Sequence, residues 1–289
     1  MVTNSTSQAL PARAWAASIT LAFKHANDRT ILHRSLHEGP LRVQRTFNEA
    51  DGSCHVYLLH PPGGVVGGDS LDIGITAADQ TDVVLTTPAA GKFYRCLDDG
   101  SEQRQLVTLQ IGAEAHFEWL PQETIFFSGA RSRLQHRVRL SGSASYIGWE
   151  ILSLGRRASG ETFRVGSIQQ STTLLRDDQL IHRERLAARP DNISGAWSFA
   201  GQTVSGTLVA ASREEFSSSR ADDRLQGLIK RLHDPQWGVT AKAGIILVRY
   251  LGNDAEHCRQ GFEFARDWLT AAGMFNVDSP RQRPRIWST

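Results

Sequence analysis

The sequence is poor in cysteine, and it contains no long apolar run. Its three cysteines, Cys54, Cys96 and Cys258, are odd in number and widely spaced, so they suggest neither a disulfide framework nor a CxxC metal knuckle. No stretch reaches the ~18 consecutive apolar residues that a membrane-spanning helix needs. The opening MVTNSTSQALPARAW lacks the pattern of a secretory signal, and residues 1–14 are expected to form a disordered leader. These absences predict a cytoplasmic protein without a membrane partner.

Basic and acidic side chains are nearly equal in number. The 289 residues carry 32 basic and 30 acidic side chains, a formal net charge of +2. Lysine occurs only at positions 24, 92, 230 and 242, so arginine supplies most of the positive charge. Such a balance gives no reason to expect a nucleic-acid partner. The length allows one large β domain, expected over residues 15–289.

Alternation of apolar and polar residues dominates the chain and predicts strands. In AHFEWLPQETIFF, Ala115, Phe117 and Trp119 alternate with His116, Glu118 and Leu120. SASYIGWEIL likewise sets Ile147, Trp149 and Ile151 against Tyr146, Gly148, Glu150 and Leu152. Glycine, Asp, Asn or Pro separates nearly every such run, as turns require, and no repeat of fixed period is evident. The pattern predicts a mainly β protein in a single domain.

Two segments late in the chain follow helical spacing instead. SRADDRLQGLIKRLHD places Leu225, Leu228, Ile229 and Leu232 on one face, with Ser219 as the cap and Asp222 in the first turn. DAEHCRQGFEFARDWLTAAG places an apolar stripe from Cys258 to Leu269 and ends at Gly273. We expect two helices that cover a face or edge of the sheets, and a tail in which Ile286 and Trp287 dock back onto the body.

The stretch LLHPPGGVVGGDS, residues 58–70, is the most distinctive local motif. It is neither a P-loop, because no Lys follows its second glycine pair, nor a GxGxxG dinucleotide fingerprint. Gly63, Gly64, Gly67 and Gly68 are expected to shape a tight turn between strands. His60 and Asp69 flank this turn, so a second interpretation is that they face a polar channel or bind a cation. His60 is a weak candidate for a metal ligand.

Several glutamates lie inside apolar strand segments, where a carboxylate needs a partner or water. Glu118, Glu123 and Glu150 neighbour Trp119, Phe126 and Trp149, and Glu184 lies in LIHRERL. One interpretation is pairing with the plentiful arginines, and another is a hydrated path for a cation. A third is a carboxylate-dependent glycoside hydrolase with Glu118 and Glu123 or Glu150 as the pair. No HExxH or GxSxG motif is present, and no closed metal site can be identified.

Several blocks match one known family in order and spacing. HPPGGVVGGD (60–69), TTPAAGKFYR (86–95), EWLPQETIFF (118–127), GRRASGETF (155–163), ERL (184–186) and PRIW (284–287) resemble the urease accessory protein UreD (UreH) family. The resemblance runs from about Trp15 to the C-terminus. It implies a β-helix-like stack of strands and sheets with two α-helices in the C-terminal half of the chain.

The resemblance also implies a function without catalysis. A UreD-like protein is a scaffold that binds UreF and the GTPase UreG, docks on apo-urease (its UreA, UreB and UreC subunits) and helps to insert nickel. No tightly bound cofactor is expected, only Ni²⁺ in transit through a hydrated tunnel. By matching blocks, the acids near that path would be Asp69, Glu150 and Glu184. Phe262, Trp268 and Phe275 are expected to contribute to an exposed apolar partner face.

Overall fold

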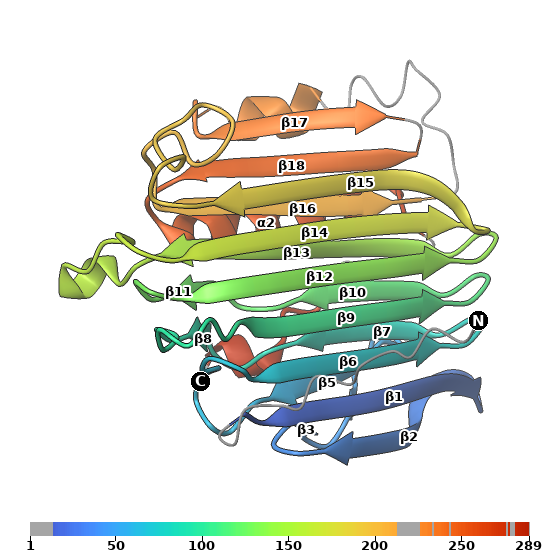
Figure 1. The fold of residues 1–289 in the computed structure, drawn as a ribbon. Coiled ribbons are helices and arrows are strands. Elements are labelled where there is room, and N and C mark those ends of the chain that lie inside the picture. The colour runs from blue at the N-terminus through green and yellow to red at the C-terminus, as the bar shows by residue number, and fades with distance from the viewer. Residues whose placement is uncertain are drawn as a thin grey trace, which may run out of the picture.

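The computed structural model describes residues 14–212, 226–232, 234–242, 244–275, 277 and 281–288, and the predicted leader lies outside this part except for Ala14. Within these residues two β-sheets face each other (Figure 1). Sheet 1 has seven strands in the order β15 (Gln179–Ala188), β14 (Ser167–Arg176), β12 (Arg131–Leu140), β9 (Gln103–Ile111), β6 (Ser70–Ala77), β1 (Ala16–Ala26) and β2 (Arg29–Glu38).

Sheet 2 has eleven strands in the described part of the chain. Its main path is β17 (Trp237–Lys242), β18 (Ile245–Gly252), β16 (Val204–Ala211), β13 (Ser145–Leu154), β10 (His116–Leu120), β7 (Asp82–Thr86), β5 (Cys54–Leu59) and β3 (Arg42–Val43). Three short strands attach beside it, β4 (Phe47–Asn48), β8 (Gly91–Phe93) and β11 (Thr124–Phe126).

The chain alternates between the sheets and coils forward as it does so. β6, β9, β12 and β14 pair in parallel in sheet 1, while β7, β10 and β13 pair in parallel in sheet 2. Each coil therefore adds one strand to each sheet. The predicted β-helix-like, mainly β fold is confirmed. Its coils begin at Ser70, Gln103, Arg131 and Ser167, so their lengths differ and the sequence shows no fixed period.

The two ends of the coils are built differently. Where β6, β9 and β12 end, four-residue corners, residues 78–81, 112–115 and 141–144, lead directly into sheet 2. At the other end, where the parallel strands of sheet 1 start, four connections are long, residues 60–69, 94–102, 155–166 and 189–203, whereas residues 127–130 before β12 form a short one. Figure 1 shows the long connections on its left-hand side. Loops that vary in length on a rigid scaffold are where proteins commonly carry function.

The space between the sheets is the main hydrophobic core. Phe117 and Trp119 point into it from β10, as the period-two pattern predicts, and Leu109 and Val138 point into it from sheet 1. The alternate residues of β10 and β13 are buried as well, because a second layer covers the outer face of sheet 2. Burial on both faces explains why β13 is mostly apolar, and it leaves His116 and Glu118 of β10 buried under the second layer.

The covering layer is α2 (Ala255–Ala271), which packs on β13, β16 and β18. Asp254 caps its first turn by accepting a hydrogen bond from the backbone N–H of His257, 3.0 Å away. Gly273 follows the helix with φ +68°, which confirms the predicted end. Phe262 and Phe275 are buried in this layer, so the expectation that they form an exposed partner face is wrong.

The other predicted helix is present over residues 226–231, whereas its expected cap, Ser219, and its first turn lie outside the described residues. Two short 3₁₀ turns complete the structure, η1 (Arg157–Ser159) and η2 (Arg285–Ser288). No helix in the described ranges is long and apolar enough to cross a bilayer.

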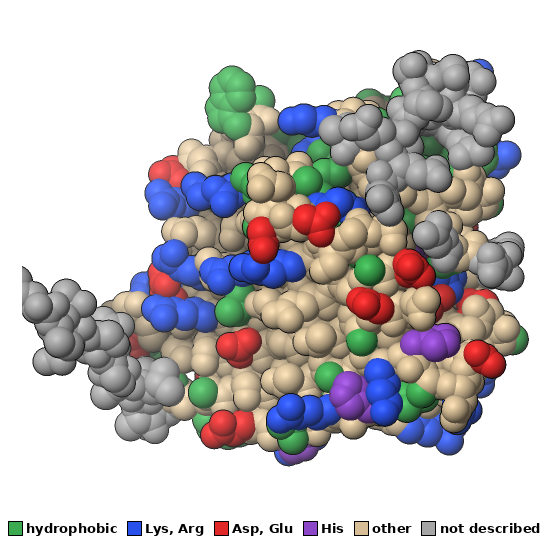
Figure 2. Space-filling view, turned by 90° about the vertical axis from the view of Figure 1, so that its right-hand side faces the viewer, with side chains coloured by type: hydrophobic (Ala, Val, Ile, Leu, Met, Phe, Trp, Pro, Cys, Tyr) green, Lys and Arg blue, Asp and Glu red, His purple; other side chains and the backbone are tan. Residues whose placement is uncertain are grey.

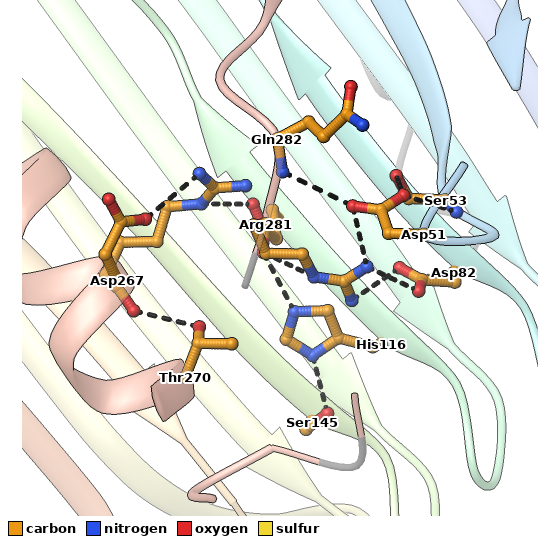
Figure 3. Close-up of polar contacts among 11 residues, drawn as sticks. Asp51, Ser53, Asp82, His116, Ser145, Asp267, Thr270, Arg281 and Gln282 are labelled. Atoms are coloured by element: carbon orange, nitrogen blue, oxygen red, sulfur yellow. Dashed lines mark hydrogen bonds and ion pairs between the residues drawn. The ribbon is translucent and has the colours of Figure 1, made fainter. Parts of the chain in front are cut away.

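The C-terminal tail docks back onto sheet 2, as predicted. The indole N–H of Trp287 donates to the hydroxyl of Thr86 at 2.9 Å. Arg281 is almost fully buried and binds both carboxylate oxygens of Asp82, at 2.7 and 2.9 Å. Its Nε also lies 3.3 Å from Glu118, so the tail supplies a cation to the buried acids of β7 and β10 (Figure 3).

Replacing Arg281 with Ala tests whether the tail stabilises the body. We expect the free energy of unfolding to fall by roughly 3–5 kcal/mol, because the change leaves buried carboxylates without their cation. Urea unfolding followed by tryptophan fluorescence measures the difference. Arg283→Ala is the matched control: Arg283 is about half exposed where it pairs with Glu263, and its loss should cost about 1 kcal/mol or less. Equal costs for the two variants would contradict this account.

Candidate functional site

The glycine stretch forms a tight loop before β6, and each glycine of the quartet has a steric reason. Gly63 and Gly68 adopt φ +79° and +91°, which side chains disfavour. A Cβ on Gly64 would lie 2.3 Å from the ring of Tyr94, and one on Gly67 would lie 2.6 Å from the hydroxyl of Ser101. The stretch is therefore a packed turn against the β8–β9 connection.

Asp69 holds this loop in place. One carboxylate oxygen accepts the backbone N–H of Trp15 at 2.9 Å, and the other accepts that of Val66 at 3.0 Å. The side chain is buried, and its charge partly opposes the desolvation that lowers the pKa of His60. Both oxygens of Asp69 are thus engaged by backbone donors, which fix where β1 and β6 begin.

Between the sheets lies a polar cavity that the sequence does not reveal as a unit. The cavity has a volume of about 50 Å³. This is several times the ~10–15 Å³ that one buried water needs. Glu150 enters it from sheet 2 and Glu184 from sheet 1. The lining is His136, Tyr146, Gly148, Trp149, Glu150, Gln170, Thr172, Glu184, Leu186, Ser205, Thr207 and Val209.

Glu150 is held by the indole of Trp119, with an imidazole nearby, rather than by arginine. Its Oε1 accepts the indole N–H of Trp119 at 2.9 Å and lies 3.5 Å from Nδ1 of His136. Its side chain is 14% exposed, so the carboxylate reaches the cavity. Burial and the nearby charge of Glu150 raise the pKa of Tyr146 well above its ordinary value, which keeps the phenol neutral.

Glu184 stands at the sheet 1 side of the cavity with two basic neighbours. Arg249 Nε donates to its Oε1 at 3.3 Å, and His182 Nε2 lies 3.6 Å from its Oε2. Burial raises the pKa of Glu184, but the nearby His182 imidazole and the Arg249 guanidinium together outweigh burial and hold the pKa below its ordinary value. The carboxylate is therefore ionised at neutral pH, and its side chain remains 29% exposed.

The three acids assigned to one path do not lie together. Glu150 and Glu184 share the cavity, whereas Asp69 is outside its lining. Asp69 precedes β6, which is four strand positions from β15 in sheet 1, or roughly 19 Å at ~4.8 Å per strand. Asp69 thus shapes the strand-start loop, and the cavity acids form a separate pair.

Glu118 faces away from this cavity. Its carboxylate is fully buried against α2, where Arg266 donates at 2.7 Å and His116 lies at 3.2 Å. Burial raises the pKa of Glu118, but Arg266, His116 and Arg281 together lower it far below its ordinary value. Glu118 and Glu150 lie on opposite faces of sheet 2, so they cannot flank one glycosidic bond as a hydrolase pair.

Sequence reasoning missed the histidines of the site. In RLQHRVRL, Leu134, His136 and Val138 alternate with other residues and are buried in β12, but this alternation does not identify a partner for the imidazole. Nδ1 of His136 makes no hydrogen bond in the described part of the protein and faces Glu150. Across the described residues, no group of three or more metal-ligating side chains converges, and His60 lines neither the cavity nor such a group.

The chain resembles known proteins over nearly its whole length. The family model described as UreD urease accessory protein matches residues 16–288. The urease accessory protein UreD of Saccharophagus degradans is 41% identical over 96% of this chain and 95% of that relative. UreD of Janthinobacterium sp. is 40% identical, over 94% and 91% of the two chains. UreD of Dechloromonas aromatica is 40% identical, over 95% of each.

Asp69→Ala tests the structural role of that acid. We expect the free energy of unfolding to fall by about 1–3 kcal/mol, because the backbone N–H groups of Trp15 and Val66 lose their acceptor. Urea unfolding measures the loss, and Asp72→Ala, at an exposed position of β6, is the control. An unchanged stability in Asp69→Ala would show that the carboxylate does not hold the loop.

A pH series tests the buried Glu118 network. The folded-state pKa of Glu118 lies below its ordinary value of 4.5, so the carboxylate contributes stability above that pH. This contribution is lost as the pH falls below 4.5. Urea midpoints from pH 7 to pH 3 should therefore fall more steeply for the unmodified chain than for Glu118→Gln. Parallel curves below pH 4.5 would be incompatible with an ionised Glu118 in the folded protein.

Proposed function

The chain belongs to the UreD family of urease accessory proteins, and we propose that it matures urease by helping to insert nickel into the apoenzyme. In this proposal it acts in the cytoplasm as a non-catalytic scaffold that binds UreF, the GTPase UreG and the urease subunits. GTP hydrolysis belongs to UreG. Nickel is cargo and not a resident cofactor of this chain.

The observation that supports the proposal is the polar cavity between the sheets, whose volume would admit water. A hydrated divalent cation needs oxygen or imidazole ligands along its path. Glu150 and Glu184 offer carboxylates from opposite sheets, and Thr172, Ser205 and Thr207 add hydroxyls. Two unit charges at 4 Å attract by ~4 kcal/mol in an intermediate dielectric. A carboxylate pair of this kind favours entry of a cation over the apolar core on either side.

The partners of these carboxylates favour transit rather than storage. Trp119 donates a hydrogen bond to Glu150, with His136 3.5 Å away, and Arg249 donates to Glu184. A cation that binds must displace these donors from the carboxylates. When the donors bind the carboxylates again, the cation is released and rehydrated. Affinity is thereby limited, as a route from which the ion must leave requires. Gly148 keeps room beside the site, because a Cβ there would lie 2.0 Å from the hydroxyl of Tyr146.

Neutralising the two acids tests nickel transfer. Glu150→Gln combined with Glu184→Gln keeps shape and most hydrogen bonds but removes both charges from the cavity. We expect urease co-produced with this variant, UreF, UreG and limiting nickel to contain at least roughly 10-fold less nickel, because a loss of only about 1.4 kcal/mol of attraction lowers occupancy tenfold. Nickel per urease is measured by atomic absorption, and assembly by size-exclusion chromatography.

Asp178→Asn is the matched control, because Asp178 is 81% exposed at the β14–β15 turn. It should leave nickel content unchanged. Nickel-loaded urease from an assembled double variant would contradict the route through the cavity while leaving the scaffold role intact. Normal, nickel-loaded urease in cells that lack the chain would contradict the maturation role itself.

A further inference from the structure

The outer face of sheet 1, which is turned away from the core, is rich in arginine. Alternate residues of β12 point outward there, and they are Arg131, Arg133, Gln135, Arg137 and Arg139. Arg183 and Arg185 of β15 share this face. In Figure 2 the upper left margin, where the face is seen edge-on, is lined mainly by Lys and Arg side chains. Because the whole chain carries a net charge of only +2, this is a local concentration of positive charge.

β14 lies between β12 and β15 and presents uncharged side chains to the same face. Ser171 is paired with Arg185 of β15, and Gln169 stands between Arg133 of β12 and Ala187 of β15. β12 and β15 are two strand positions apart, which corresponds to roughly 10 Å. Long arginine side chains on both flanks, with Ser171 and Ala187 as the floor, therefore leave a hollow.

This hollow is an open cavity of about 400 Å³. Its polar lining consists of Arg133, Gln135, Gln169, Gln170, Ser171 and Arg185. The guanidinium groups, the side-chain amides and the hydroxyl can all donate hydrogen bonds, and no carboxylate lines the cavity within the described residues. Two permanent positive charges, several donors and no acid favour an anion as the ligand.

The arginines of the cavity have fewer partners within the chain than their neighbours. Arg139, outside the cavity, pairs with Asp178 at 2.9 Å. Arg133 lies 3.6 Å from Glu102 and is 47% exposed. Arg185 is exposed, and it makes no hydrogen bond or ion pair with any residue in the described ranges. The cavity thus contains a guanidinium whose charge no described acid offsets.

Acids on this face, or in the connections beside it, lie outside the cavity. Asp72 belongs to β6, three strand positions from β14, or roughly 14 Å away. Asp98 and Asp99 are exposed in the connection before β9, and Asp191 is exposed in the connection after β15. None of these four lines the cavity. A bound anion would therefore meet arginine without meeting a carboxylate.

The shape of the cavity and the composition of its strands favour a phosphate over other anions. A tetrahedral phosphate accepts hydrogen bonds from several sides, which suits donors on both flanks and on the floor, and arginine binds it bidentately. β12, β14 and β15 contain no Phe, Tyr or Trp, so they offer no aromatic platform for the bases of a nucleic acid. Small-molecule pockets have volumes of about 300–1,000 Å³, and the cavity falls in this range.

We propose that this cavity on the outer face of sheet 1 binds a phosphorylated small molecule through Arg133 and Arg185. The hydroxyl of Ser171 completes the donor set from the floor. The site lies on the opposite face of sheet 1 from the cavity that Glu184 enters. It therefore goes beyond the proposed function and does not depend on it.

Calorimetric titration of the complete chain with inorganic diphosphate, in about 150 mM salt, tests the site. Arg133→Gln combined with Arg185→Gln should weaken binding roughly 10-fold or more, because charge-assisted hydrogen bonds to phosphate are lost. Ser171→Met keeps every charge but fills the floor, so it should weaken binding as well. Arg29→Gln combined with Arg34→Gln removes the same charge from exposed positions of β2, at the other edge of sheet 1, and should leave binding unchanged. Circular dichroism verifies that every variant is folded.

Absence of diphosphate binding to the unmodified chain would overturn the proposal. Equal weakening by the two arginine double variants would indicate diffuse charge instead of a site, and unchanged affinity in Ser171→Met would place the anion outside the cavity. Either result contradicts the proposal. Citrate, a hexaglutamate peptide and an oligouridylate represent other anions, and tighter binding of any of them than of diphosphate would exclude a phosphorylated small molecule as the occupant.

Discussion

Burying a carboxylate between β layers costs several kcal/mol unless a cation, hydrogen-bond donors or water accompany it, and this constraint organises the molecule. The two faces of sheet 2 stabilise their buried carboxylates in different ways. Toward α2, Glu118 is locked by Arg266 and by Arg281 of the tail, which joins helix, sheet and C-terminus into one body. Toward sheet 1, Glu150 accepts a hydrogen bond from the Trp119 indole, has no arginine partner, and opens to a polar cavity. The first arrangement stabilises the fold, and the second leaves the negative charge of Glu150 available to a cation.

The coil architecture places these features. Because each turn of the chain adds one strand to each sheet, inward polar residues distant in sequence, such as Glu150 and Glu184, come to face one another. The same progression brings the connections 60–69, 94–102, 155–166 and 189–203 to one end, where the glycine loop lies. An interior polar cavity between the sheets suits the proposed role, in which the GTPase activity belongs to another protein.

Much of the fold could be predicted from local pattern. Period-two alternation located the strands, helical spacing located α2, and the quartet from Gly63 to Gly68 predicted the tight turn. The assignment of Glu150 and Glu184 to a polar path could be made only through family resemblance, since strand order and register are not local properties. Grouping Asp69 with them overlooked that backbone donors take both of its oxygens. Phe262 and Phe275 were misjudged because amphipathic spacing cannot tell which layer covers a helix.

The most direct test of the central claim is anomalous diffraction at the nickel absorption edge from crystals soaked in Ni²⁺. The account predicts ordered water and a partially occupied nickel peak between the carboxylates of Glu150 and Glu184. A dry cavity without a peak, or a peak at Asp69 instead, would contradict the claim that this pair of acids receives the passing cation.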